Sequence, residues 1–259
     1  MDTLNLSVDA RGVATLSLAR PEKHNALSGA MITELSEAAH DLAADNAVRV
    51  VVLTGQGASF CAGGDLGWMR DQIAADDQGK ATAARELAQM LFDLNTLPKP
   101  MIGLVNGNAF GGGIGMMSVC DVVIADRAAK FGLTETRLGL LPATIGPYVA
   151  GRMGEANARR VFMSSRVFNA EEAQTLGLIK SSVETTNLDA AVEAEVAPYL
   201  SCAPDAVAEA KALLRSLGPK IDTEVIEDSI AALIKRWKSP ESAEGIAAFF
   251  EKRPANWTK

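Results

Sequence analysis

Apolar and polar residues alternate at every second position in two short runs near the start of the chain. Residues 4–8 and 13–18 both show this period of two, which is typical of strands with one buried face. Residues 9–12, Asp-Ala-Arg-Gly, are types that favour turns. The pattern therefore predicts an N-terminal β-hairpin.

The spacing of apolar residues then changes to three and four. Ser28 is a suitable N-cap for a helix that continues to about Leu42. Beyond it, apolar runs and breaks predict an alternation of strands at 48–53, 101–105 and 122–125 with helices at 83–94 and 114–120. Strands that alternate with helices indicate an α/β fold with right-handed crossovers. The polar stretch 70–80 is expected to be a loop.

The C-terminal part has a different pattern. From about residue 187 the spacing is mostly helical, and Ser239-Pro240 offers an N-cap followed by proline at the first helical position. With 259 residues, 48% of them hydrophobic and 22% charged, the chain fits one large α/β unit with a small helical appendage.

Charge and cysteine content narrow the functional classes. The net charge of −7 disfavours binding to nucleic acid or to an anionic membrane, because both need a positive field. No run approaches the roughly 18 apolar residues of a membrane span, and the N-terminus has no basic region followed by an apolar one. Three cysteines without a CxxC pair suit a reducing compartment. We therefore expect a cytoplasmic protein whose thiols serve packing.

A glycine-rich segment, Asn-Gly-Asn-Ala-Phe-Gly-Gly-Gly at 106–113, lies between a predicted strand and a predicted buried helix. The backbone amides at a helix N-terminus are unpaired, and glycines let a substrate carbonyl approach them. Such a segment can form an oxyanion hole. It contains neither GxGxxG nor the Lys-Ser/Thr of a P-loop. A tight turn without a ligand explains the glycines equally well.

A second turn of small residues, Ser-Phe-Cys-Ala-Gly-Gly-Asp-Leu at 59–66, also follows a predicted strand. Taken alone, it is as compatible with an ordinary strand-to-helix turn as with a binding loop. Taken together, the two turns could direct two amides at one oxygen.

These motifs resemble those of the crotonase, or enoyl-CoA hydratase/isomerase, superfamily. The similar segments are FCAGGDL and VNGNAFGGG, followed by FGLTETRLGLLP, and they are flanked by RPEKHNAL at 20–27 and FEKRP at 250–254. The resemblance covers nearly the whole chain. It implies a crotonase-type spiral of ββα units over residues 1–195, and a C-terminal helical region over 196–259 that covers the site and forms trimer contacts. Family members are usually homotrimers or dimers of trimers.

The resemblance also assigns roles to residues in both turns. It makes the amides of Gly64 and Gly112 the two donors that hold the thioester oxygen as an enolate forms. Lys23 would approach the CoA phosphates, although an exposed lysine that binds no ligand is an equally good interpretation. Asp65 would contact substrate, although the residue type favours loop capping over that role. Further substrate contacts would come from neighbouring positions, namely Ala26, Ala62, Gly63 and Leu66.

Glu135 matches the general acid/base of the family, whereas sequence alone would favour a surface carboxylate. Where two-glutamate hydratases carry their other acid, this chain has Gly115. The segment LPATIGPYV at 141–149 replaces the family's glycine-rich P-G-x-G-G-T. In both positions the sequence is similar to hydratases that act on branched or carboxylated enoyl-CoAs, such as the methylglutaconyl-CoA type in leucine breakdown. We expect Gly115 to leave space for substrate or water.

The resulting expectation is a hydro-lyase that adds water reversibly to an enoyl-CoA thioester. An enoyl-CoA isomerase that uses one glutamate is a rival enzyme, and an acyl-CoA-binding protein without catalysis is a rival from another class. A hydrolytic triad is not expected, since the chain has two histidines and no GxSxG. No metal or redox cofactor is implied, because coenzyme A enters as part of the substrate.

Overall fold

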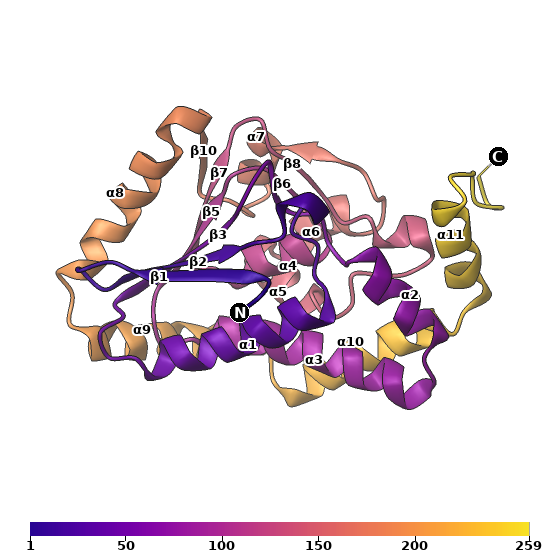
Figure 1. Cartoon of the computed structure of the whole chain (residues 1–259), viewed down its shortest axis with the longest axis horizontal. Helices are drawn as coiled ribbons and strands as arrows, with labels where there is room; N and C mark the ends of the chain where they lie inside the picture. The colour runs from indigo at the N-terminus through magenta and orange to yellow at the C-terminus, as the bar shows by residue number, and fades with distance from the viewer. Residues whose placement is uncertain (259) are drawn as a thin grey trace.

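The computed structural model describes residues 1–258 as two β-sheets surrounded by helices (Figure 1). The larger sheet has the strand order β1 (Leu4–Val8), β2 (Val13–Leu18), β3 (Val50–Gly55), β5 (Met101–Val105), β7 (Val122–Asp126) and β10 (Ser181–Val183). The smaller sheet has the order β4 (Ser59–Cys61), β6 (Asn108–Phe110), β8 (Lys130–Gly132) and β9 (Phe168–Asn169). Only β1–β2 and β8–β9 pair antiparallel; every other pair in these sheets is parallel.

Eleven α-helices and three short 3₁₀ helices connect the strands within residues 1–258. The α-helices are α1 (Gly29–Ala44), α2 (Leu66–Ala74), α3 (Asp77–Thr96), α4 (Gly112–Val119), α5 (Gly146–Met153), α6 (Glu155–Phe162), α7 (Ala170–Thr175), α8 (Leu188–Leu200), α9 (Pro204–Leu217), α10 (Thr223–Trp237) and α11 (Pro240–Phe250). The 3₁₀ helices are η1 (Pro21–Lys23), η2 (Glu135–Leu138) and η3 (Thr185–Asn187).

The strands follow a repeated path between the two sheets. In β3–β4, β5–β6 and β7–β8, the first strand joins the larger sheet, the second joins the smaller one, and helical structure follows. This confirms the expected α/β spiral of ββα units. Because the strands within each sheet run parallel, the segments that leave β4, β6 and β8 emerge at one edge of the smaller sheet.

The larger sheet is buried on both faces at its centre, around β3, which explains the continuous apolar run of that strand. Val51 and Leu53 belong to the main core, together with the buried face of α1. Val50 and Val52 point the other way and pack in a separate cluster with α8. Figure 1 shows α1 and α3 on one side of this sheet and α8 on the other.

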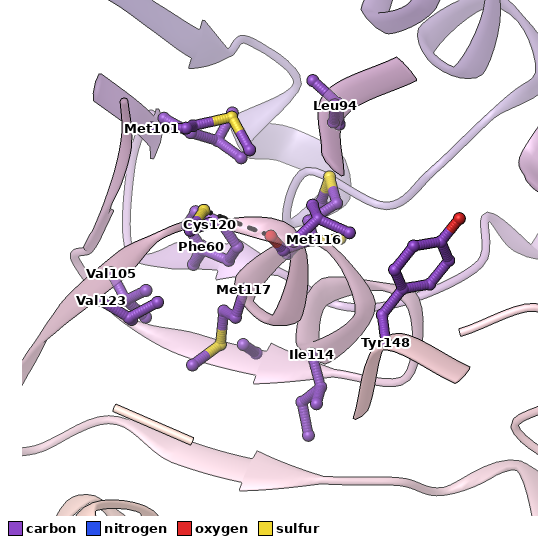
Figure 2. Close-up of a cluster of buried hydrophobic side chains, with 14 of the residues drawn as sticks. Phe60, Leu94, Met101, Val105, Ile114, Met116, Met117, Cys120, Val123 and Tyr148 are labelled. Atoms are coloured by element: carbon purple, nitrogen blue, oxygen red, sulfur yellow. Dashed lines mark hydrogen bonds between the residues drawn. The ribbon is translucent and has the colours of Figure 1, made fainter. Parts of the chain in front are cut away.

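Helix α4 is buried along almost its whole length, from Gly113 to Val119. Figure 2 shows Met116 and Met117 of this helix among apolar side chains from several strands. The Cys120 thiol donates a hydrogen bond of 3.3 Å to the Met116 carbonyl oxygen and closes the C-terminal turn. Flexible methionines fill such irregular interiors well. Because the whole helix is packed in the core, the position of its N-terminus is fixed as well.

Several of the predicted elements are confirmed, and one predicted loop is wrong. The N-terminal hairpin is present, and the Ser28 hydroxyl caps α1 by accepting a hydrogen bond from the Met31 amide. The expected loop at 70–80 is instead mostly helical, because the Asp76 side chain caps α3 at Gly79 and starts that helix early.

Residue 195, the predicted boundary of the spiral core, lies inside α8. No helix within residues 1–258 is long and apolar enough to span a membrane.

The loop before α1 is fixed by Asn25, which is fully buried and has a φ of 54°. Its Nδ2 donates to the carbonyl oxygens of Gln56 (2.9 Å) and Ser59 (2.8 Å). Its Oδ1 accepts a hydrogen bond of 2.9 Å from the Arg20 amide. One side chain therefore joins the N-terminal loop to the turn between β3 and β4.

We predict that Asn25→Gly lowers the free energy of unfolding by about 2–3 kcal/mol, because buried backbone groups lose their partners. Glycine adopts a positive φ without strain, so the loss reports the hydrogen bonds. Asn169→Gly is the matched control, since this N-cap has one bond, to Glu172, and glycine there costs only a few tenths of a kcal/mol. Urea denaturation measures both variants, and equal losses would contradict the prediction.

Candidate functional site

Two glycine turns meet where β4 and β6 end. These strands pair in parallel, with Cys61 opposite Ala109. Gly63 and Gly111 have positive φ values of 95° and 48°. A Cβ on Gly63 would lie 3.2 Å from the Phe110 carbonyl oxygen, and a Cβ on Gly111 would lie 3.9 Å from the Gly63 Cα. The contact at Gly63 is thus tighter than a side chain normally makes, and the two backbones lie in van der Waals contact.

The Gly64 amide is directed away from the segment that precedes α1. Leu27 forms a parallel bridge there: its amide donates to the Gly63 carbonyl oxygen (2.8 Å), and its own carbonyl oxygen accepts from the Asp65 amide (2.9 Å). In a parallel bridge both bonds go to the residues that flank the paired one. Gly64 therefore directs its own N–H to the other side, where it lines a cavity.

Gly112 lines the same cavity from the N-terminus of α4. As the first residue of the helix, Gly112 has no carbonyl one turn earlier to accept its N–H. The adjacent amide is used differently, because Gly111 donates to the Gly132 carbonyl oxygen (2.9 Å). The positive end of the helix dipole adds to the attraction for an anionic oxygen.

Glu135 begins η2, three residues after the end of β8, and places its carboxyl group beside the glycine turns. A Cβ on Gly111 would lie 2.9 Å from Glu135 Oε1. Glu135 Oε2 is buried and has no hydrogen-bond partner among residues 1–258. Burial raises the pKa of this carboxyl group to about 7. A carboxyl group in this environment can exchange a proton near neutral pH.

The cavity has a volume of about 430 Å³ and a mostly apolar lining. Trp68 of α2 and Trp237 of α10 both line it and contact each other edge to face, with ring centroids 6.3 Å apart. Within residues 1–258, its charged lining side chains are Glu135 and Arg137. The predicted site residues that line it are Ala62, Gly63, Gly64, Leu66, Gly112 and Glu135.

Four predicted residues do not line the cavity: Lys23, Ala26, Asp65 and Gly115. Lys23 is exposed and Ala26 is buried. The Asp65 carboxylate caps α2, accepting from the Gly67 amide (2.8 Å), and pairs with Arg20 at 3.0 Å. These bonds support the capping interpretation. The contacts of Lys23 and Ala26 with substrate stay predictions.

The space expected beside Gly115 is not present. A Cβ on Gly115 would lie 2.4 Å from Ile145 Cγ2, because the isoleucine side chain already occupies that position. The expectation of a vacancy for substrate or water at Gly115 was therefore wrong. The sequence could not reveal this, since the two residues lie on different elements, 30 positions apart.

Two other residues that shape the site, Arg20 and Trp237, were not predicted, because their contacts also join segments that are far apart in the sequence. Arg20 holds the N-terminal loop through Ala26 O (2.9 Å) and Asp65 Oδ2 (3.0 Å). The only sequence signal was its place in the segment RPEKHNAL. Trp237 reaches the cavity from a helix far along the chain, and no local pattern indicates that contact.

Comparison with known proteins agrees with this geometry. Residues 9–259 match the family model described as enoyl-CoA hydratase/isomerase. The mevalonyl-coenzyme A hydratase of Aspergillus fumigatus is 32% identical, with coverage of 95% of this chain and 91% of that protein. An enoyl-CoA hydratase structure from Shewanella pealeana has 37% identity and a TM-score of 0.81, covering 98% of this chain and 96% of the other.

A second solved structure, an enoyl-CoA hydratase from Mycobacterium avium, is 30% identical with a TM-score of 0.85 over the full length of both chains. The family match spans nearly the whole sequence and includes both glycine turns and Glu135. The chain therefore belongs to the enoyl-CoA hydratase/isomerase, or crotonase, family of enzymes.

Proposed function

We propose that this enzyme is a hydro-lyase that adds water reversibly to the double bond of an enoyl-CoA thioester. The observation that carries the proposal is the convergence of two cavity-facing amides, from Gly64 and Gly112, with the enclosed carboxyl group of Glu135. Two donors suit an oxygen that gains negative charge, and one carboxyl group of raised pKa suits proton transfer beside it.

In this mechanism the thioester oxygen accepts hydrogen bonds from both amides. The Glu135 carboxylate takes a proton from water while the water oxygen bonds to the β-carbon. The double-bond electrons move towards the thioester, and an enolate forms whose oxygen the amides stabilise. Glu135 then returns the proton to the α-carbon and the thioester is restored. The low polarity of the cavity strengthens these interactions.

The finer proposal concerns the acyl group. The apolar lining from Leu141, Ile145 and the two tryptophans supports a branched acyl chain. A carboxylated chain, such as 3-methylglutaconyl-CoA of leucine degradation, would need a cation. Arg137 lines the cavity, and its Nη2 donates to the Ser165 carbonyl oxygen at 3.3 Å. The branched alternative needs no cation, so the apolar lining supports it more directly than the carboxylated one.

An isomerase is the rival reaction, because Glu135 alone can move a proton between two carbons. We predict that product formed in ¹⁸O-labelled water from a 2-enoyl-CoA contains one labelled oxygen, which mass spectrometry detects. A shifted double bond without label would establish isomerisation instead. Tight binding of acyl-CoA thioesters without any turnover would favour a non-catalytic binding protein.

The same proposal includes a homotrimer, or a dimer of trimers. Helix α9 buries none of its residues 204–217 within this chain, and it exposes 60–74% of Leu213, Leu214 and Leu217. A second copy of the chain would remove these leucines from water. Sedimentation of wild type and Leu213→Glu tests the assembly, and an unchanged monomer in both would reject it. The cytoplasmic location and the absence of a separate cofactor stay predictions.

We predict that Glu135→Gln retains the fold but loses ~10²–10⁴-fold in turnover, the usual contribution of general acid/base catalysis. Wild-type kcat/KM should rise with pH through about 7, because the carboxylate is the form that accepts the proton from water. Glu155→Gln, at an exposed ion pair with Arg159, is the control and should retain activity. Near-normal turnover of Glu135→Gln would remove this residue from the mechanism.

A second variant tests the oxyanion contact directly. Gly112→Pro deletes one N–H at the first helical position, where proline is well tolerated. Gly112→Ala is the matched control, because both variants add a Cβ that meets Leu27 Cδ1 at 2.6 Å, and only proline removes the donor. We predict that the proline variant turns over ~10²–10³-fold more slowly than the alanine variant. Equal rates would show that the Gly112 amide does not bind the oxygen.

A further inference from the structure

Ile145 lies between the cavity and a glycine of α4. It is the N-cap residue of α5, is 3% exposed, and lines the cavity. A Cβ built on Gly115 would lie 2.4 Å from Ile145 Cγ2 and 2.9 Å from Ile145 Cβ. Both distances are below any normal van der Waals contact, and the second involves a branch point that rotation cannot move. A larger residue at 115 is therefore incompatible with isoleucine at 145.

Gly115 also faces the same direction as a residue of the site. Gly112 and Gly115 are three residues apart on α4, so they share one face of the helix. Gly112 lines the cavity directly, whereas Gly115 is covered by Ile145. A side chain at 115 would extend towards the cavity if the isoleucine were smaller.

We propose that Gly115 and Ile145 form a coupled pair that limits this site to one carboxylate and makes Ile145 a specificity-determining residue. The structural half of the proposal rests on the contact alone; the catalytic half rests on the function proposed above. The two segments in which the sequence departs from the expected pattern, at 115 and at 141–149, thus meet in the structure. Glycine makes room, and isoleucine fills it.

Because isoleucine occupies the space beside Gly115, the acyl group meets an apolar side chain at this position in place of a polar one. Apolar methyl groups stand where a polar side chain from α4 would have to pass, so they neither hold nor activate water. Glu135 then acts as the sole acid/base, and Ile145 offers an apolar contact to a substituent on the reacting carbons. A substrate with a methyl branch at the β-carbon gains from this contact, whereas a straight chain gains less.

A four-member mutant cycle tests the pair: wild type, Gly115→Glu, Ile145→Gly and the double variant. Gly115→Glu should lower the thermal midpoint because the new side chain clashes, and Ile145→Gly should lower it by leaving a cavity. The double variant should melt above Gly115→Glu, since each change removes the defect of the other. Gly115→Glu combined with Ile124→Ala is the control and should give no such rescue, because Ile124 is buried to the same degree but belongs to the separate cluster that packs with α8.

Turnover provides the second measurement, with crotonyl-CoA and its β-methyl analogue, 3-methylcrotonyl-CoA. The ratio of kcat/KM for the branched over the straight substrate should fall at least ~10-fold in the double variant, because one or two lost methyl contacts are worth about that much. Rescue of the midpoint with an unchanged ratio would overturn the specificity role.

The outcomes separate the pair from the proposed function. If the two substitutions shift the thermal midpoint additively and the wild type is an active hydratase, the coupled pair is rejected and the hydratase proposal stands. Rescue of the midpoint with no turnover in wild type would reject the hydratase proposal and support the structural pair. A double variant no more stable than Gly115→Glu would reject the pair whatever the activity.

Discussion

The close approach of two backbone turns is the constraint on which the site depends. Parallel pairing of β4 with β6 brings Gly63 against Gly111, and neither position has room for a side chain without a shift. Both glycines adopt positive φ values that other residues rarely reach. This geometry leaves the next amide in each turn free to face the cavity. The buried helix α4 and the Asn25 loop hold the two turns in place.

The second determinant is the burial of the Glu135 carboxyl group, which has no cationic partner within residues 1–258. An ion pair would lower the pKa of a carboxyl group, as in a structural bridge, whereas burial alone raises it. The value of about 7 follows from this environment. The proposed reaction needs a group that both accepts and releases a proton, and a carboxyl group in an apolar chamber suits that role. The methyl groups of Ile145 belong to the same chamber.

Much of the architecture could be predicted from periodicity, because strands buried on one or both faces and amphipathic helices have different spacings. The hairpin, α1 and the strands β3, β5 and β7 were found in this way. The two glycine turns were recognised by composition, but their contact depends on strand pairing in the smaller sheet. The covering of Gly115 by Ile145 and the contribution of Trp237 depend on tertiary packing. Helix α2 was missed because it buries only Gln72 and carries little apolar signal.

A crystal structure with a bound, slowly reacting acyl-CoA analogue tests the central claim most directly. The account predicts that the thioester oxygen lies within about 3.1 Å of both the Gly64 and the Gly112 nitrogens. It also places the α- and β-carbons beside the Glu135 carboxyl group, with the acyl chain among Trp68, Ile145 and Trp237. A thioester oxygen bound to neither amide, with the acyl chain outside this cavity, would contradict it.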